Sequence, residues 1–184
     1  MITRQEAFAL LEKNLRTKNL VKHSLAVEAI LSAMAVRLGE DPELWGVTGL
    51  LHDLDYEFTK AEPERHAFIT AKMVDELLPK EATNAIKAHN YQYTAQIPLT
   101  YLDKSLIAAD AVSGLIIAAA LVMPSKRLAD VTPKTLADKF KDKSFAAGCN
   151  RKRIELCEDM ELGLQMFLEL SLQALKGISG ELGL

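Results

Sequence analysis

The chain has 184 residues, of which 49% are hydrophobic and 26% are charged, and its formal net charge is −3. This composition excludes an intrinsically disordered protein, and the length suffices for one domain with a substantial core. The small negative charge provides no general attraction to nucleic acid, so no nucleic-acid partner is expected.

Three local features of the sequence predict the cellular location of the protein. Residues 1–6 are neither basic nor followed by a signal-like apolar run, so no secretion is expected. The longest apolar run, residues 108–123, is interrupted by Asp110 and is short for a membrane span, which predicts a buried helix and no membrane partner. Cys149 and Cys157 lie too far apart for a local disulfide on one helix and match no zinc-site spacing. Reduced thiols and a cytoplasmic location are therefore predicted.

The N-terminal part of the chain shows two helical patterns. The segment Thr3-Arg4-Gln5-Glu6 has the form of a capping box, and it predicts a helix that extends to about residue 16. Residues 18–38 carry an apolar stripe at helical spacing, and His23 lies on that stripe. His23 is therefore expected to face the core, and Gly39 is the expected end of this helix.

A third predicted helix begins at Asp41-Pro42 and leads to the pair His52 and Asp53. Residues 54–60 lack a clean period and are expected to form a loop. A fourth helix is predicted from about Pro63, with His66 on its apolar stripe.

Two further helices carry candidate site residues. The first runs from about Lys80 to Asn90 and places His89 in register with apolar neighbours. A loop over residues 91–98 separates it from a long apolar helix, residues 99–121, which has Asp110 at its midpoint.

The C-terminal third is predicted to be helical as well. Thr132-Pro133 begins a short helix, and a long final helix is expected over residues 150–176. No segment alternates with the period of two that is typical of strands. The sequence thus predicts an all-α bundle that forms a single domain over residues 1–184, and it does not indicate the oligomeric state.

His52 and Asp53 are adjacent at the end of an apolar segment, where both side chains can approach one metal ion. The alternative is a histidine stabilised by the helix dipole, followed by an aspartate that begins a turn. Asp110 lies among apolar residues, and a carboxylate there has to be paired, protonated or bound to a metal. Four histidines in the first half of the chain, together with this buried acid, favour the metal site.

The ordered set of His23, His52, Asp53 and Asp110 resembles the HD superfamily of metal-dependent phosphohydrolases. The resemblance covers about residues 18–120 and leaves residues 121–184 as a helical extension. It implies that these four residues are metal ligands.

His66 and His89 lie between the His-Asp pair and Asp110, as in the members of the superfamily that hold two metal ions. The resemblance implies that these histidines bind the second ion and that Asp53 is shared by both. Imidazole and carboxylate ligands together suit iron, manganese, cobalt, nickel or zinc.

The chain departs from many two-metal relatives directly after the pair, because Leu54-Asp55-Tyr56 stands where they have Ile-Gly-Lys. The Gly-Tyr-Pro motif of the cyclic-dinucleotide branch is also missing. The resemblance therefore implies hydrolysis of a small phosphoester, such as a nucleotide, by metal-bound hydroxide. Two alternatives stay open, namely a di-iron oxygenase of the same fold and a nucleotide-binding sensor with little catalysis.

Further candidate residues would act around this centre. Besides Asp53, the predicted catalytic residues are Asp55, which would orient a ligand histidine or move a proton, and Lys104, which would approach from the start of its helix. Arg151 and Lys143, from the basic run between residues 139 and 153, are predicted to bind the substrate phosphate. The alternative for these residues is solvated surface charge.

Overall fold

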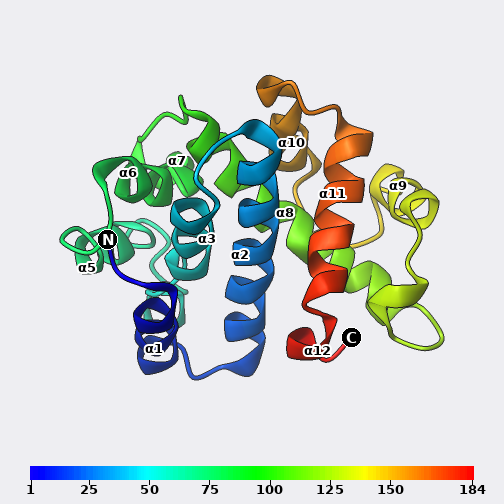
Figure 1. Ribbon diagram of the computed structural model, residues 1–184, viewed down its shortest axis with the longest axis horizontal. Helices are drawn as coiled ribbons and strands as arrows, with labels where there is room; N and C mark the ends of the chain where they lie inside the picture. The colour runs from blue at the N-terminus through cyan, green and yellow to red at the C-terminus, as the bar shows by residue number, and fades with distance from the viewer.

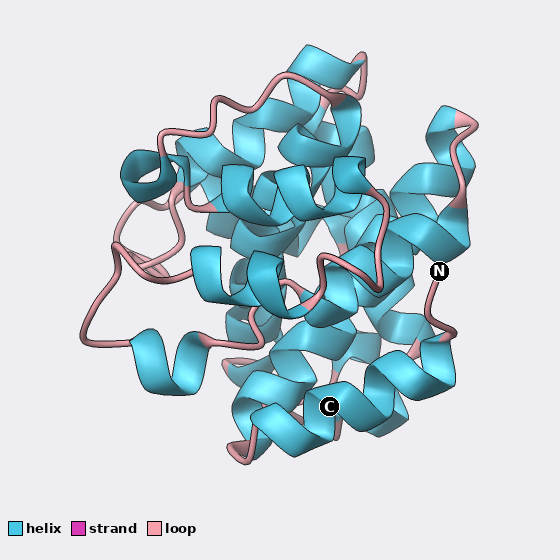
Figure 2. Ribbon diagram, turned by 90° about the vertical axis from the view of Figure 1, so that its left-hand side faces the viewer, coloured by secondary structure: helices cyan, strands magenta, loops and turns pink.

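Every regular element of this protein is a helix. The computed structural model describes residues 1–184 and contains no β-strand (Figures 1 and 2). This confirms the all-α class that the helical period of the apolar residues predicted. In chain order the elements are α1 (Arg4–Asn14), α2 (Lys18–Leu38), α3 (Pro42–Leu51), α4 (Tyr56–Thr59), α5 (Phe68–Met73), α6 (Lys80–His89), α7 (Tyr91–Thr94), α8 (Tyr101–Leu121), the short 3-10 helix η1 (Leu128–Asp130), α9 (Pro133–Lys141), α10 (Arg151–Ile154), η2 (Glu155–Met160), α11 (Leu164–Gly177) and α12 (Ser179–Leu182).

The predicted caps at the start of α1, the end of α2 and the start of α3 are all present. The hydroxyl of Thr3 accepts a hydrogen bond from the backbone N–H of Glu6, and the Glu6 carboxylate accepts one from the backbone N–H of Thr3 at 2.9 Å. Gly39 ends α2 in the left-handed conformation with φ 77°. The Asp41 carboxylate accepts two backbone N–H groups of the first turn of α3. The end of α1 at Asn14 lies two residues before the predicted one.

Helices α2 and α3 approach each other closely through a glycine. A Cβ atom on Gly49 would lie 3.0 Å from the carbonyl oxygen of Val27 and 3.1 Å from the backbone nitrogen of Glu28. Only a residue without a side chain allows this distance between the two backbones. The contact positions the end of α3, and therefore His52 and Asp53, against the middle of α2.

Helix α8 is the central element of the bundle and runs obliquely behind α2 and α11 in Figure 1. It packs against α2, α6, α10 and α11. Its alanines at 108, 109, 119 and 120 are fully buried, and their small side chains let the neighbouring helices come near. Because α8 contacts both groups, this one long helix connects the N-terminal helices with the C-terminal ones. It also carries Asp110.

The C-terminal helices share their core with the N-terminal ones. One continuous cluster of buried apolar side chains includes Ala7 of α1, Leu106 of α8, Phe167 of α11 and Leu182 of α12. Helix α11 lies beside α2 in Figure 1, and the two are in contact.

Two predicted helices are wrong in their extent. The helix predicted from Pro63 begins only at Phe68, because Ala67 has φ 72° and interrupts the helical backbone before it. His66 therefore lies in the preceding turn and not on a helical stripe. The helix predicted over residues 150–176 is divided into α10, η2 and α11, and Glu161, with φ 59°, ends η2 before α11 begins. The predicted loops at 54–60 and 91–98 contain the single-turn helices α4 and α7.

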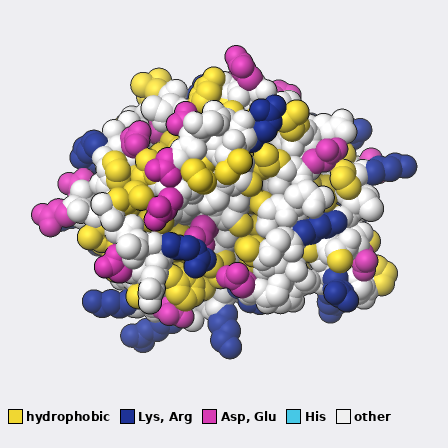
Figure 3. All heavy atoms as spheres, in the orientation of Figure 1, with side chains coloured by type: hydrophobic (Ala, Val, Ile, Leu, Met, Phe, Trp, Pro, Cys, Tyr) yellow, Lys and Arg dark blue, Asp and Glu magenta, His cyan; other side chains and the backbone are white.

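Helices α2 and α8 are long and apolar enough to cross a membrane by length and composition alone. Within the bundle, 50% of the apolar window of α2 and 67% of that of α8 are buried. Burial of this kind is typical of core helices in globular folds. On the face shown in Figure 3, positive and negative side chains are interspersed among apolar ones.

Candidate metal centre

The end of α3 brings His52 and Asp53 to the centre of the candidate site. Nδ1 of His52, the C-cap residue of α3, is 2.7 Å from the carbonyl oxygen of Gly49. His52 is fully buried, and Asp53 is 7% exposed. The side chains stay close despite being adjacent in sequence, because the helix ends here, and His52 Nε2 lies 3.3 Å from Asp53 Oδ1.

Helices α2 and α8 each add one residue on the opposite side of Asp53. His23 Nε2 lies 3.3 Å from Asp110 Oδ1 and 3.8 Å from Asp53 Oδ2. The other ring nitrogen of His23 is 3.2 Å from Ser113 Oγ, and the Ser113 hydroxyl donates to the carbonyl of Asp110. The helical stripe that predicted an inward-facing His23 thus directs its ring to the site.

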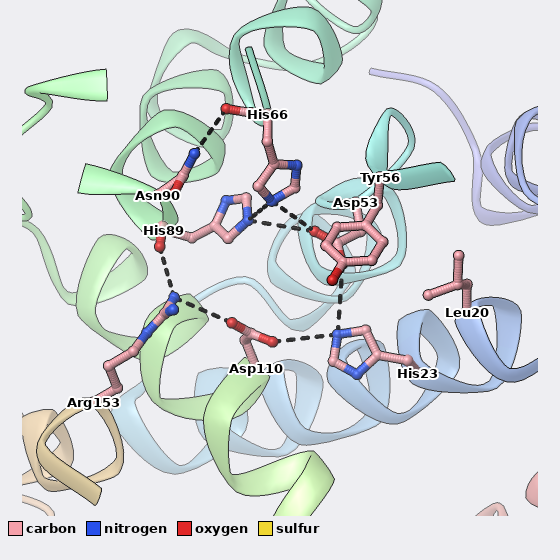
Figure 4. Close-up of a pocket in the computed structure, with 9 residues that line it drawn as sticks. All are labelled: Leu20, His23, Asp53, Tyr56, His66, His89, Asn90, Asp110 and Arg153. Carbon is pink, nitrogen blue, oxygen red and sulfur yellow. Dashed lines mark hydrogen bonds and ion pairs between the residues drawn. The ribbon is translucent and has the colours of Figure 1, made fainter. Parts of the chain in front are cut away.

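His66 and His89 approach the other oxygen of the same aspartate. Their Nε2 atoms lie 3.3 and 3.4 Å from Asp53 Oδ1, and 3.0 Å from each other. His66 Nδ1 is 2.7 Å from Asp55 Oδ1, and His89 Nδ1 contacts the carbonyl of Ile86. Figure 4 shows both rings and the Asp53 carboxylate converging on one region.

The hydrogen bonds at Nδ1 determine which nitrogen of each ring carries a proton. His52 and His89 each face a carbonyl oxygen through Nδ1, and a carbonyl only accepts, so Nδ1 is the protonated nitrogen in the neutral rings. Their Nε2 atoms then present lone pairs to the site. Nε2 of His52 is buried and has no hydrogen-bond partner. A buried lone pair of this kind fits coordination to a metal ion.

The ligand atoms form two groups that share Asp53. The atoms of His23, His52 and Asp53 lie within 4.8 Å of one another, and so do those of Asp53, His66 and His89. Asp110 completes the predicted set beside His23. The structure therefore brings together all six side chains that the sequence named as ligands, from five separate segments, and the family resemblance predicted the same division into two groups.

Burial and charge shift the pKa values in this cluster. Burial lowers the pKa of His52 to about 4, which keeps this ring neutral. Burial alone would raise the pKa of Asp53, but His52, His89 and His66 hold it well below its usual value. Burial likewise opposes ionisation of Asp110, yet the hydrogen bond with His23 and the charge of Arg153 lower its pKa.

The pKa of His23 and that of His66 move in the other direction. Burial disfavours both imidazolium ions, but the contacts of His23 with Asp110 and of His66 with Asp55 outweigh it and raise both pKa values. The carboxylates are thus ionised, and they favour positive charge on the groups beside them. An array of this kind favours a divalent cation.

A pocket of about 400 Å³ opens onto the cluster. Its lining includes five of the six candidate ligands, and the fully buried His52 lies behind them. The other lining residues are Leu20, Tyr56, Asn90 and Arg153 (Figure 4).

Sequence reasoning did not single out Tyr56, Asn90 or Arg153 as site residues. Arg153 is 43 positions after Asp110, and nothing in the basic run marks which of its members turns toward α8. Asn90, at the end of α6, donates to the carbonyls of Pro63 and His66, and so ties the turn that carries His66 to α6. Asn90 directly follows His89 and Tyr56 lies close to Asp53 in the sequence, which is the one available signal for these two residues.

Asp55 lies directly behind the ligands and is fully buried. Besides His66, its carboxylate accepts hydrogen bonds from the backbone N–H groups of Ala67 and Thr70, both at 2.9 Å. It therefore has the contacts of a residue that orients a ligand histidine, the first of the two roles considered for it. Glu57, the other acid of this loop, accepts the N–H groups of Arg16 and Thr17 on the surface.

The structure places three predicted site residues away from the pocket. The guanidinium of Arg151 donates to six backbone carbonyls between residues 139 and 149, so it holds that loop and has no donors left for a phosphate. Lys143 is exposed in the same loop and does not line the pocket. Lys104 forms an ion pair with Asp159 at 3.0 Å, because the start of α8 faces η2. Each of these residues was predicted from its positive charge alone. The packing of the helices determines which partners the charged groups meet.

Comparison with known proteins finds relatives of this chain. The chain is 36% identical over 142 residues to the Ribonuclease Y of Desulfotalea psychrophila, a match that covers 73% of this chain and 26% of that protein. It is also 36% identical over 97 residues to the Ribonuclease Y of Protochlamydia amoebophila, covering 52% of this chain and 18% of that protein. The chain thus spans about a quarter or less of the length of these curated relatives. No solved structure matches the chain.

The family comparison agrees with the site. The model of the HD domain matches residues 20–120, a segment that begins in α2 before His23 and ends in α8 after Asp110. All six candidate ligands lie inside it. The chain therefore belongs to the HD domain family, most of whose members are metal-dependent phosphohydrolases.

Proposed function

We propose that this protein is a divalent-metal-dependent phosphohydrolase that cleaves a small phosphoester, such as a nucleotide, in the cytoplasm. The observation that carries the proposal is the convergence of four imidazoles and two carboxylates on one end of a pocket. A phosphoester group with a small leaving group fits a pocket of about 400 Å³.

We assign the ligands to two ions. His23, His52, Asp53 and Asp110 hold the first, and His66 and His89 hold the second together with Asp53. The shared position of Asp53 between the two groups of ligand atoms supports this division. Iron, manganese, cobalt, nickel and zinc all suit imidazole and carboxylate ligands. When bound, such ions lower the pKa of water and neutralise charge on a phosphate.

The protein side chains prepare the site for that chemistry. Asp55 keeps the proton of His66 on Nδ1, and the carbonyls of Gly49 and Ile86 do the same for His52 and His89. Each Nε2 lone pair is thereby directed inward before any ion arrives. The ionised Asp53 and Asp110 set the negative charge of the site, and burial limits the access of bulk water to it.

The proposal is tested by metal analysis and hydrolysis together. Protein purified without chelators is expected to contain a divalent transition metal, measured by mass spectrometry of the elements. It should hydrolyse an aryl phosphate or a nucleotide in the presence of manganese, cobalt, nickel or zinc. Protein with no bound metal and no turnover with any of these ions would refute the proposal. Activity with redox-inert zinc excludes the oxygenase alternative, which requires oxygen uptake by the iron-loaded protein.

The relatives support a second candidate substrate, the phosphodiester bond of RNA. The two proteins compared above are named ribonucleases, and the match with the Desulfotalea psychrophila protein extends over 142 residues. Hydrolysis of an end-labelled RNA oligonucleotide, measured beside mononucleotides under the same metal conditions, separates the two. Cleavage of the oligonucleotide at a higher kcat/KM than any mononucleotide would favour RNA.

A further inference from the structure

Arg153 is the only lysine or arginine on the wall of the pocket at the candidate metal centre. The same wall carries the carboxylates of Asp53 and Asp110. A phosphate group is repelled by both, so positive charge from the protein is needed near its oxygens in addition to that of the ions. Arg153 lies outside the segment that matches the HD domain, residues 20–120, so the C-terminal part of this chain supplies it.

Two contacts hold the guanidinium of Arg153 in place. Its Nη2 donates to the carbonyl oxygen of His89 at 2.6 Å and lies 3.1 Å from Asp110 Oδ2. Figure 4 shows the side chain reaching from α10 to a position beside both residues. One nitrogen of the group is thus engaged with two neighbours of the site, one on α6 and one on α8.

The other nitrogens of the guanidinium are not engaged. Nη1 makes no hydrogen bond to the protein, and Nε is buried without a partner. Nη1 is not among the buried atoms, so a ligand in the pocket can reach it. The free N–H groups of Nη1 fit the oxygens of a phosphate, which accept strong charge-assisted hydrogen bonds from a guanidinium.

The preceding arginine explains how α10 is fixed. Arg151 holds the loop before α10 through six backbone carbonyls, and Asn150 caps the helix by accepting from the N–H of Lys152. Arg153 therefore projects from an anchored base, and little conformational entropy is lost when it binds a ligand.

We propose that Arg153 is a substrate-binding residue that donates to a non-bridging oxygen of the substrate's phosphate group. This inference rests on the proposed phosphohydrolase function and adds the residue that recognises the anion. In this assignment Nη2 keeps its contacts with His89 and Asp110, and Nη1 donates to the phosphate.

The test compares Arg153→Met, Arg153→Lys and the control Lys152→Met, which removes a charge from the exposed neighbouring side chain. Metal content is measured first. KM and kcat for a phosphoester that the wild type hydrolyses and the Kd of inorganic phosphate, by calorimetry, are measured next. A charge-assisted hydrogen bond predicts that Arg153→Met raises KM and the phosphate Kd at least about tenfold. Arg153→Lys should fall between, and Lys152→Met should equal the wild type.

The possible failures are distinguishable. A wild type that binds no phosphate and hydrolyses no phosphoester would overturn the proposed function and this inference with it. An active wild type together with an unchanged phosphate Kd and KM in Arg153→Met would overturn the inference alone. If both Arg153 variants lose metal in proportion to activity while the phosphate Kd of the remaining metal-loaded fraction is unchanged, Arg153 only positions Asp110, which also overturns the phosphate contact.

Discussion

Asp55 determines the geometry of His66 and of the turn that carries it. Its carboxylate binds the imidazole Nδ1–H and two backbone N–H groups, and its own N–H donates to Thr70 Oγ1. One buried side chain thus accepts the backbone N–H groups of the turn at Ala67, where φ is positive, and orients the imidazole of His66.

Asp55→Ala is expected to affect both stability and metal binding. It leaves two buried backbone donors without a partner, so we expect a loss of about 3 kcal/mol in the free energy of unfolding. His66 also loses its orienting partner, which predicts about 10- to 100-fold weaker binding of the second ion. Denaturant unfolding and metal titration measure the two effects. The control is Asp75→Ala, whose exposed pair with Lys80 should matter by less than about 0.5 kcal/mol. Equal effects in the two variants would contradict the assignment.

Single ligand substitutions should separate the two ions. Because Asp53 lies in both groups of ligand atoms, Asp53→Ala is expected to abolish binding of both. His89 lies in one group, so His89→Ala should lose mainly the second ion. The measurement is the molar metal content after equilibration with a defined free-ion concentration. Wild-type metal content in His89→Ala would rule out a two-ion site that involves this residue.

Metal affinity should decrease as the pH is lowered, and the raised pKa values of His23 and His66 set the pH at which the decrease begins. The pKa values of His23 and His66 lie above the ordinary 6.5, so protons occupy both rings at a pH where free histidine is already neutral. An ion has to displace these protons, and its affinity is therefore full above the raised pKa values and falls below them. The decline should be about tenfold per pH unit for each proton displaced. Zinc titrations across this range measure it, and an affinity independent of pH would exclude the two histidines as ligands.

The candidate ligands were predictable from the sequence, and Arg153 was not, for a physical reason. A histidine on an apolar stripe or an aspartate inside an apolar helix is anomalous in sequence, as His23 and Asp110 show. An arginine among other cations is ordinary. Whether Arg151 or Arg153 reaches the pocket depends on the angle at which α10 meets α8, and no local pattern encodes that angle.

At the scale of elements, the contact between α2 and α3 positions the His-Asp pair. Gly49→Ala is expected to lower the free energy of unfolding by about 1–3 kcal/mol, because the new methyl group meets the backbone of α2 at 3.0 Å. The shift of α3 should also weaken metal binding through His52. Gly177→Ala is the matched control, since nothing lies within 4 Å of its Cβ position, and it should be neutral or stabilising by up to about 1 kcal/mol. Equal unfolding midpoints for the two variants would contradict close approach at Gly49.

The elements with side-chain caps were predictable at their starts, as at Thr3, Asp41 and Thr132. The interruptions at Ala67 and Glu161 were not, because neither residue type favours φ near 60–70° by itself. Glu161 is the C-cap of η2, and its N–H donates to the carbonyls of Cys157 and Glu158. At Ala67 the corresponding contact is the hydrogen bond from its N–H to buried Asp55.

At the scale of the molecule, bound metal should stabilise the whole bundle. A ligand at a free concentration 100 times its Kd adds about 2.7 kcal/mol to the free energy of unfolding. For a domain of this size that predicts a rise in Tm of about 5–10 °C when manganese or zinc is added to chelator-treated protein. Scanning calorimetry measures it, and Asp53→Ala should show no rise. A wild-type Tm that is unchanged by both the ion and the chelator would contradict a metal site in the folded state.

The position of α8 has a consequence for how the protein comes apart. This helix contributes buried surface to the ligand-bearing helices on one side and to α10 and α11 on the other. Because both halves share this helix and one core, we expect them to unfold in one cooperative transition. A destabilising substitution anywhere along α8 should then lower the stability of both halves of the chain together.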